Sequence, residues 1–79
     1  MDKSIHNEDY KKCIELLRLK RIERSITQEQ VAAKLNTTQA DVSKIEMCER
    51  RIDIIELRNI CFALNLSFVD FIDELDKSI

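Results

Sequence analysis

The chain has 79 residues and a formal net charge of −2, with 44% hydrophobic and 35% charged residues and neither glycine nor proline, which predicts a single domain over residues 1–79. No apolar run approaches the roughly 20 residues of a membrane-spanning helix, and the N-terminal segment is too polar for a signal peptide. Three cysteines without a Cys-x-x-Cys spacing argue against a disulfide framework and a zinc site, so we expect a cytoplasmic protein with no metal and no cofactor.

The spacing of the apolar residues predicts an all-α chain. These residues recur every three or four positions, whereas the alternation typical of strands is absent. A first helix is predicted roughly from Asn7 to Arg24, with one apolar face formed by Tyr10, Cys13, Ile14 and Leu17. We expect the first six or so residues to be flexible, and His6 to be an exposed imidazole rather than a metal ligand.

Four pairs of polar residues mark four further helix starts. In each pair a Ser, Thr or Asp side chain can cap the first turn, and a Gln, Glu or Asp follows three positions later. The pairs are Thr27/Gln30, Thr38/Asp41, Asp53/Glu56 and Ser67/Asp70. An apolar repeat follows each pair. Asn36 and Asn65 are expected to end the second and fourth helices, because asparagine tolerates a left-handed backbone.

The stretch TQEQVAAKLNTTQADVSKIE, residues 27–46, is predicted to form two short helices joined by a tight turn. In a helix-turn-helix of this kind, the second helix enters the major groove of double-stranded DNA. Val42 and Ile45 would face the protein interior and leave small and polar side chains outside. The residues expected to face base edges are Thr38, Gln39, Ala40, Ser43 and Lys44.

Gln39 is the sharpest of these candidates, because its carboxamide donates and accepts at once and matches the N6/N7 edge of adenine. Gln28, at the start of the preceding helix, is placed to hold a backbone phosphate. The charge distribution agrees, since residues 18–51 carry eight Lys/Arg against five Asp/Glu and residues 52–79 carry two against six. We therefore expect a DNA-facing surface in the basic middle of the chain and an acidic surface kept away from DNA.

These segments resemble the helix-turn-helix family of phage repressor and Cro proteins (XRE-type), which includes the small controller proteins of restriction–modification systems. The resemblance covers about residues 14–75 and is carried by LRLKRIERSITQEQVAAKL, TTQADVSKIE, ERRIDIIEL and ICFALNLS. It implies a five-helix, lambda-repressor-like DNA-binding domain whose second and third helices form the helix-turn-helix. It also implies a homodimer that reads paired operator half-sites.

The resemblance assigns further roles by position. Arg50 and Arg51, in the loop after the third helix, match phosphate contacts, and Arg21 and Glu46 match a pair that often forms a partly buried salt bridge. Asp41 is a departure from the family: either it is directed at the helix cap, or it weakens or redirects the reading of DNA. The family usually has glycine with a positive φ at four helix ends, which are here Ser25, Asn36, Cys48 and Asn65.

Five short helices cannot easily bury all the apolar residues of the last two. We expect Ile55, Val69 and Ile72 to form a homodimer interface; the alternative is that they close the core. The predicted function is a sequence-specific transcriptional regulator. The alternative is a protein-interaction module, such as an antitoxin-like subunit whose acidic C-terminal part covers a basic protein partner. The sequence shows no nucleophile–base arrangement, glycine loop or metal cluster, so we do not expect an enzyme.

Overall fold

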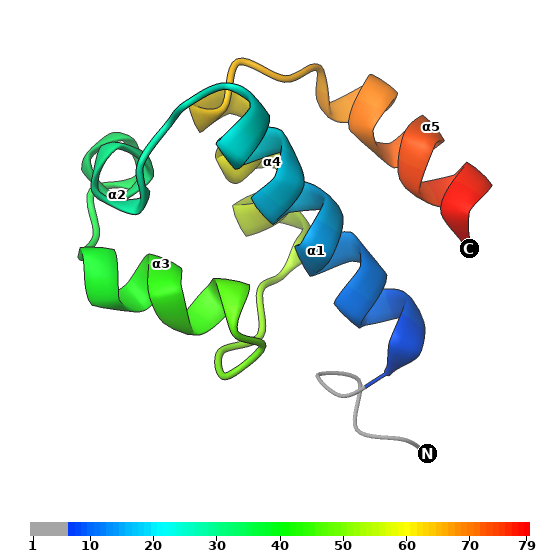
Figure 1. Ribbon diagram of the computed structural model, residues 1–79, viewed down its shortest axis with the longest axis horizontal. Helices are drawn as coiled ribbons and strands as arrows, with labels where there is room; N and C mark the ends of the chain where they lie inside the picture. The colour runs from blue at the N-terminus through cyan, green and yellow to red at the C-terminus, as the bar shows by residue number, and fades with distance from the viewer. Residues whose placement is uncertain (1–6) are drawn as a thin grey trace.

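The computed structural model describes residues 7–79, which form five helices and no strand (Figure 1). The helices are α1 (Glu8–Glu23), α2 (Gln28–Leu35), α3 (Gln39–Glu46), α4 (Ile54–Ala63) and α5 (Phe68–Ser78). The predicted all-α class, the number of helices and the boundaries are confirmed. The flexibility expected of the first residues, and the exposed imidazole of His6, lie outside the described residues.

The helices begin at the predicted caps. Thr27 accepts the amide of Gln30 through its hydroxyl, and the Gln30 side chain accepts the amide of Thr27, which completes a capping box. Asp53 and Glu56 form a second complete box at the start of α4. Each box satisfies two backbone donors that a helix start would otherwise leave unpaired, which explains how a chain without proline or glycine sets its boundaries.

Non-glycine residues in the left-handed conformation follow the ends of α1, α2, α3 and α4. Their φ values lie between 55° and 59°, and they are Ser25, Asn36, Cys48 and Asn65. At each one the amide of the next residue bonds to a carbonyl five positions earlier, as in the Ile26–Arg21 and Thr37–Ala32 bonds of 3.1 and 2.9 Å. The four positions at which the family uses glycine are therefore the positions with positive φ.

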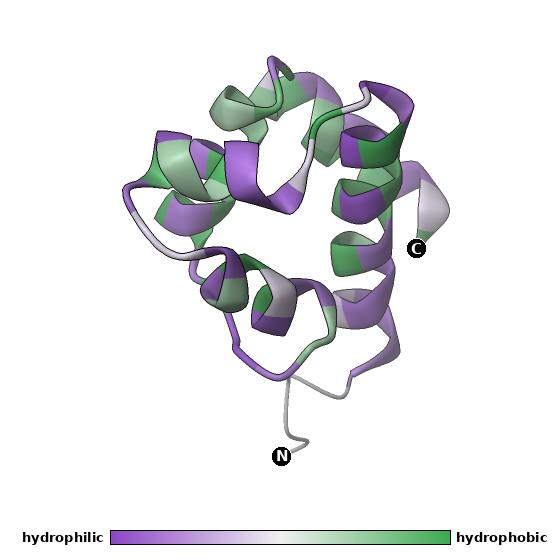
Figure 2. Cartoon of the chain, turned by 60° about the vertical axis from the view of Figure 1, so that its left-hand side comes forward, coloured by the Kyte–Doolittle hydropathy of each residue, from purple (hydrophilic) through white to green (hydrophobic). Residues whose placement is uncertain are grey.

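One hydrophobic core joins the five helices. Its buried members among residues 7–79 are Cys13, Ile14, Leu17, Val31, Ala32, Val42, Ile45, Ile52, Leu57, Ile60, Cys61, Ala63, Leu64 and Phe71. Hydrophobic and hydrophilic residues alternate along the helices in Figure 2, as expected when amphipathic helices share one core. The phenolic oxygen of Tyr10 accepts the amide of Ile52 at 3.1 Å and so fixes the loop between α3 and α4 to α1.

The arrangement separates α3 from α5. In Figure 1, α2 and α3 lie to one side of α1 and α4, while α5 lies on the other side. α5 packs on α1 and α4, and Lys20 of α1 binds Glu74 of α5 at 2.8 Å. The acidic helix is thus held away from the helix that was expected to approach DNA.

Candidate nucleic-acid interface

The third helix turns one side inward and the other to solvent. Val42 and Ile45 are each 4% exposed and belong to the core. The predicted groove-facing residues lie on the other side, where Ser43 is half-buried and the exposed ones are Thr38, Gln39, Ala40 and Lys44. Thr38 caps α3 by accepting the amide of Asp41 at 3.1 Å, so the positive end of the helix dipole lies beside these residues.

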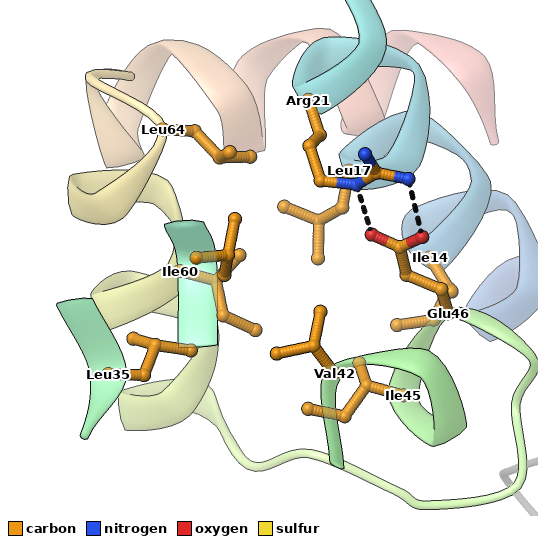
Figure 3. Close-up of a pocket in the computed structure, with 10 residues that line it drawn as sticks. Ile14, Leu17, Arg21, Leu35, Val42, Ile45, Glu46, Ile60 and Leu64 are labelled. Carbon is orange, nitrogen blue, oxygen red and sulfur yellow. Dashed lines mark hydrogen bonds and ion pairs between the residues drawn. The ribbon is translucent and has the colours of Figure 1, made fainter. Parts of the chain in front are cut away.

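An ion pair ties α3 to α1 from the inner side. The Arg21 guanidinium binds the Glu46 carboxylate through two bonds, Nε–Oε2 at 2.6 Å and Nη2–Oε1 at 2.9 Å (Figure 3). Both side chains are largely buried, with 13% and 10% exposed, and they lie beside Leu17 and Ile45. Arg21 also donates to the carbonyl of Ile26 at 2.9 Å. The adjoining cavity, of about 20 Å³, leaves no space for a ligand.

The ion pair continues outward through two glutamines. Gln28 donates from Nε2 to Oε1 of Glu46 at 2.9 Å, and Gln39 donates from Nε2 to Oε1 of Gln28 at 2.6 Å. A side-chain relay therefore runs from Arg21 in α1 to the first residue of α3. The Glu46 carboxylate can only accept, so Gln28 must present its Nε2 to Glu46 and its Oε1 to Gln39. Gln39 must then donate from Nε2, and its carboxamide is held in one orientation.

Arg50 and Arg51 differ in their surroundings. Arg50 donates from Nε to Asp41 at 2.8 Å, from Nη2 to Glu56 at 2.5 Å and from Nη1 to the carbonyl of Arg51 at 3.3 Å. The hydrogen bond with Glu56, above all, raises the pKa of Arg50, which keeps it protonated. A phosphate contact by Arg50 would have to come from a guanidinium that already binds two carboxylates, whereas Arg51 is exposed.

The side chain of Asp41 is not directed at the cap. One of its oxygens binds Arg50, and the other accepts the hydroxyl of Thr37 at 2.9 Å. Sequence reasoning could not find this arrangement, because the two carboxylates that hold Arg50 come from different helices.

Met47 is a surface residue that sequence reasoning left out of the interface. It is 58% exposed and directly follows α3, and it lies four and seven residues after Ser43 and Ala40. This spacing puts Met47 on the same side of the helix as those two residues. The spacing is visible in the sequence and could have identified Met47 as part of this surface.

The residues expected at a dimer interface are only partly outside the core. Ile55 and Val69 are 60% and 74% exposed, and Ile72 is half-buried against the core. Further exposed apolar side chains are Ile54 and Phe62 on α4 and Ile79 at the C-terminus. The expectation that these helices leave apolar residues uncovered is therefore correct for the free chain.

The remaining candidate chemistry is limited. Cys13 and Cys61 are buried free thiols whose pKa values burial raises to about 11, and Cys48 is a half-buried free thiol. Within residues 7–79, no group of three or more His, Cys, Asp or Glu side chains is arranged to hold a metal ion. No helix in that range is long and apolar enough to cross a membrane.

A comparison with protein families matches residues 17–71 to a helix-turn-helix family model. A search of curated protein sequences finds no match. Among solved structures, an XRE-family like protein from Pseudomonas syringae pv. tomato str. DC3000 is 35% identical. Its TM-score is 0.87, over 94% of this chain and 90% of that chain.

Two further structures extend the comparison. The restriction–modification controller protein C.Esp1396I, solved as a tetramer with its natural 35-base-pair operator, is 30% identical with a TM-score of 0.82, over 91% of this chain and 95% of that chain. The clp gene regulator ClgR from C. glutamicum, at 20% identity, has a TM-score of 0.78 over 94% of this chain and 96% of that chain, which shows a shared fold.

Proposed function

The chain belongs to the helix-turn-helix family, and we propose that it is a transcriptional regulator that binds double-stranded operator DNA in a sequence-specific way as a homodimer. The observation that carries this proposal is the two-sided character of α3. Its inner side is fixed by Val42, Ile45 and the ion pair of Glu46, so its outer side is a rigid surface with short polar side chains at the N-terminal turn.

Gln39 reads a base edge in this proposal. Its bond to Gln28 uses one N–H and leaves the second N–H and the carbonyl oxygen for adenine N6/N7. A bidentate contact of this kind discriminates against other bases by about 1–3 kcal/mol. Because Gln28 holds the Gln39 amide before DNA arrives, little side-chain freedom is lost on binding.

The other outward residues of α3 complete the base-reading surface. Thr38 and Ala40 lie at the same turn as Gln39, and Ala40 suits the methyl group of thymine. Ser43 and Lys44 follow one turn later and reach further bases or phosphate. Met47, beyond them, adds an apolar side chain at the far end of this surface.

Phosphate contacts fix the domain on the duplex. Gln28 has one N–H of its amide left after bonding Glu46, and it lies at the positive end of α2. Arg51 extends from the loop after α3, next to Arg50. Contacts of this kind position the protein without reading sequence, and each one makes the affinity fall with added salt.

Homodimerisation through Ile55, Val69 and Ile72 would place two copies of α3 on successive half-sites. Apolar side chains that exceed half exposure on two adjacent helices support this interface. A two-fold dimer of this family type reads half-sites about 34–36 Å apart along the duplex, which is one helical turn.

The experiment is a selection of binding sites from random duplex DNA, followed by titration of the chosen site and of DNA from the promoter of its own operon. We expect a two-fold symmetric site, an affinity that falls steeply between low and moderate salt, and a mass in solution of two chains. Recovery of unrelated sequences rules out sequence-specific binding, and an affinity that does not respond to salt rules out the phosphate contacts.

A protein-interaction module is the second candidate, and one observation favours it. The acidic residues of α5 are on the side of the domain away from α3, so DNA bound at α3 would not cover them. These residues are Asp70, Asp73, Glu74 and Asp76. A basic protein that co-purifies in stoichiometric amounts, together with weak DNA binding by the isolated chain, would support this candidate.

A further inference from the structure

We propose that Arg50 supports DNA binding indirectly, by neutralising Asp41 in the first turn of α3, and not by contacting a phosphate. This inference rests on the proposed function, because it concerns the helix that enters the groove. It makes Arg50 a positioning and charge-compensating residue, whereas its place in the loop after α3 alone would suggest a phosphate ligand.

The contacts of Arg50 point into the protein. Its Nε meets Asp41 at 2.8 Å and its Nη2 meets Glu56 at 2.5 Å, so the guanidinium bridges the start of α3 to the start of α4. The third nitrogen bonds the backbone carbonyl of Arg51. Each nitrogen uses one N–H in these bonds, so turning the guanidinium itself toward a phosphate would break at least one charge-assisted bond and move the cation away from a carboxylate.

These groups line a depression on one flank of α3. It measures about 150 Å³, and its lining includes polar groups of Arg50, Glu56 and Thr37 and the apolar side chains of Leu35 and Ile45. Asp41 lies on this flank, next to Ile45 on the helix surface and away from the line of Ala40, Ser43 and Met47. Arg50 is therefore aimed at the space between α3 and α4.

An unneutralised Asp41 would oppose DNA binding. It occupies the third position of α3 and so lies in the first turn, which approaches the duplex most closely when a helix-turn-helix binds DNA. A free carboxylate there would repel phosphates and would offset the positive end of the helix dipole. The ion pair with Arg50, which Arg50 shares with Glu56, offsets part of that charge, and together with the hydrogen bond from the hydroxyl of Thr37 it holds the carboxylate on this flank of the helix.

The test is a double-mutant cycle on the DNA site selected by the unmodified protein. The variants are Arg50→Gln, Asp41→Asn and the two together, and dissociation constants are measured by fluorescence anisotropy. Glu56 loses its partner Arg50 both in Arg50→Gln and in the double variant, so this loss cancels when the coupling energy between Arg50 and Asp41 is calculated. Arg51→Gln, alone and with Asp41→Asn, is the matched control because it removes the same charge from the neighbouring position.

We expect Arg50→Gln to weaken binding about tenfold in the original background and less than about threefold beside Asp41→Asn, which is the signature of coupled residues. The control Arg51→Gln should cost the same factor in both backgrounds. The salt dependence of binding should not change when Arg50→Gln is introduced beside Asp41→Asn, since no phosphate contact is lost.

An equal loss from Arg50→Gln in both backgrounds, with a shallower salt dependence, would overturn the inference and identify Arg50 as a phosphate ligand. Circular dichroism and thermal melts establish that each variant is folded. If Arg50→Gln does not fold alone, Arg50→Met, which also removes the charge, replaces it in both backgrounds. A protein that selects no site at all contradicts the proposed function, whereas a protein that selects a site without this coupling contradicts the inference alone.

Discussion

The side-chain amide of Gln39 donates a hydrogen bond of 2.6 Å to the side-chain oxygen of Gln28, and these two glutamines are the first residues of α3 and α2. The bond joins the residue expected to read a base with the residue expected to hold a phosphate. If Gln39 and Gln28 have the roles proposed for them, one contact within the protein links base recognition to phosphate binding.

Replacing either glutamine should affect recognition in different ways. We expect Gln39→Ala to remove the preference for one base pair in each half-site at a cost of about 1–3 kcal/mol. Gln28→Ala should weaken binding to every sequence and also reduce that same preference, because Gln39 loses its support. Titrations of the selected site and of single-base variants measure both effects. A normal preference in Gln28→Ala would show that the relay has no role in orienting Gln39.

The Arg21–Glu46 pair should contribute to stability chiefly by avoiding an unpaired charge. Glu46→Ala leaves the Arg21 guanidinium without its bidentate partner at 13% exposure, so we expect unfolding to become easier by about 3 kcal/mol. Urea unfolding measures this change. Arg21→Leu combined with Glu46→Leu should cost less than Glu46→Ala alone, and Glu49→Ala, an exposed carboxylate in the next loop, serves as the neutral control.

Stability should fall at alkaline pH because two thiols resist deprotonation when folded. Burial raises the pKa of Cys13 and of Cys61 from the ordinary value of 9.0 to about 11. The unfolded chain loses these protons first, so the contribution to stability is complete below pH 9 and is lost progressively as the pH rises toward 11. Urea unfolding at about pH 8 and about pH 10.5 tests this, and Cys61→Ala should show a smaller decline between the two conditions.

Charged substitutions on α4 and α5 should separate the homodimer that we propose. We expect Ile55→Asp and Val69→Asp to give single chains in light scattering and a weaker, less cooperative response to the two-half-site operator. Ile22→Asp is the matched control, because Ile22 is 46% exposed on α1. Dimers that persist in both variants, at concentrations near the dissociation constant, would place the interface elsewhere.

Glycine at a helix end should stabilise the domain where the present residue is not suited to its conformation. Ser25 has φ 55°, and a left-handed backbone costs a residue with a Cβ atom about 1–2 kcal/mol. We expect Ser25→Gly to raise the free energy of unfolding by roughly 1 kcal/mol, less the entropy that glycine adds to the unfolded chain. Asn36→Gly should change it less, since asparagine tolerates this region. Thermal melts compare the two.

The sequence predicted the elements well because its local signals agreed with one another. Thr27 with Gln30 and Asp53 with Glu56 each specify a helix start from four consecutive residues, and the apolar repeat that follows identifies the buried side. Val42 and Ile45 were assigned inward by spacing alone. Local spacing of this kind requires no knowledge of how the helices pack.

The contacts of the candidate site were less accessible. Arg50 binds Asp41 and Glu56, which lie nine residues before it and six residues after it, and no period in the sequence links the three. The relay through Gln28 likewise depends on the crossing of α1, α2 and α3. Side-chain partners across helices follow from the packing angle and not from the spacing of residues along the chain.

The left-handed turn at Asn36 has a consequence for how the domain meets its target. The turn between α2 and α3 is closed by the bond from the Thr37 amide to Ala32 and is followed by the bond from Thr37 to Asp41. It contains no glycine, so it has few other conformations available to it. This turn therefore has its ordered shape before the duplex arrives, so ordering it adds little to the conformational entropy lost on binding.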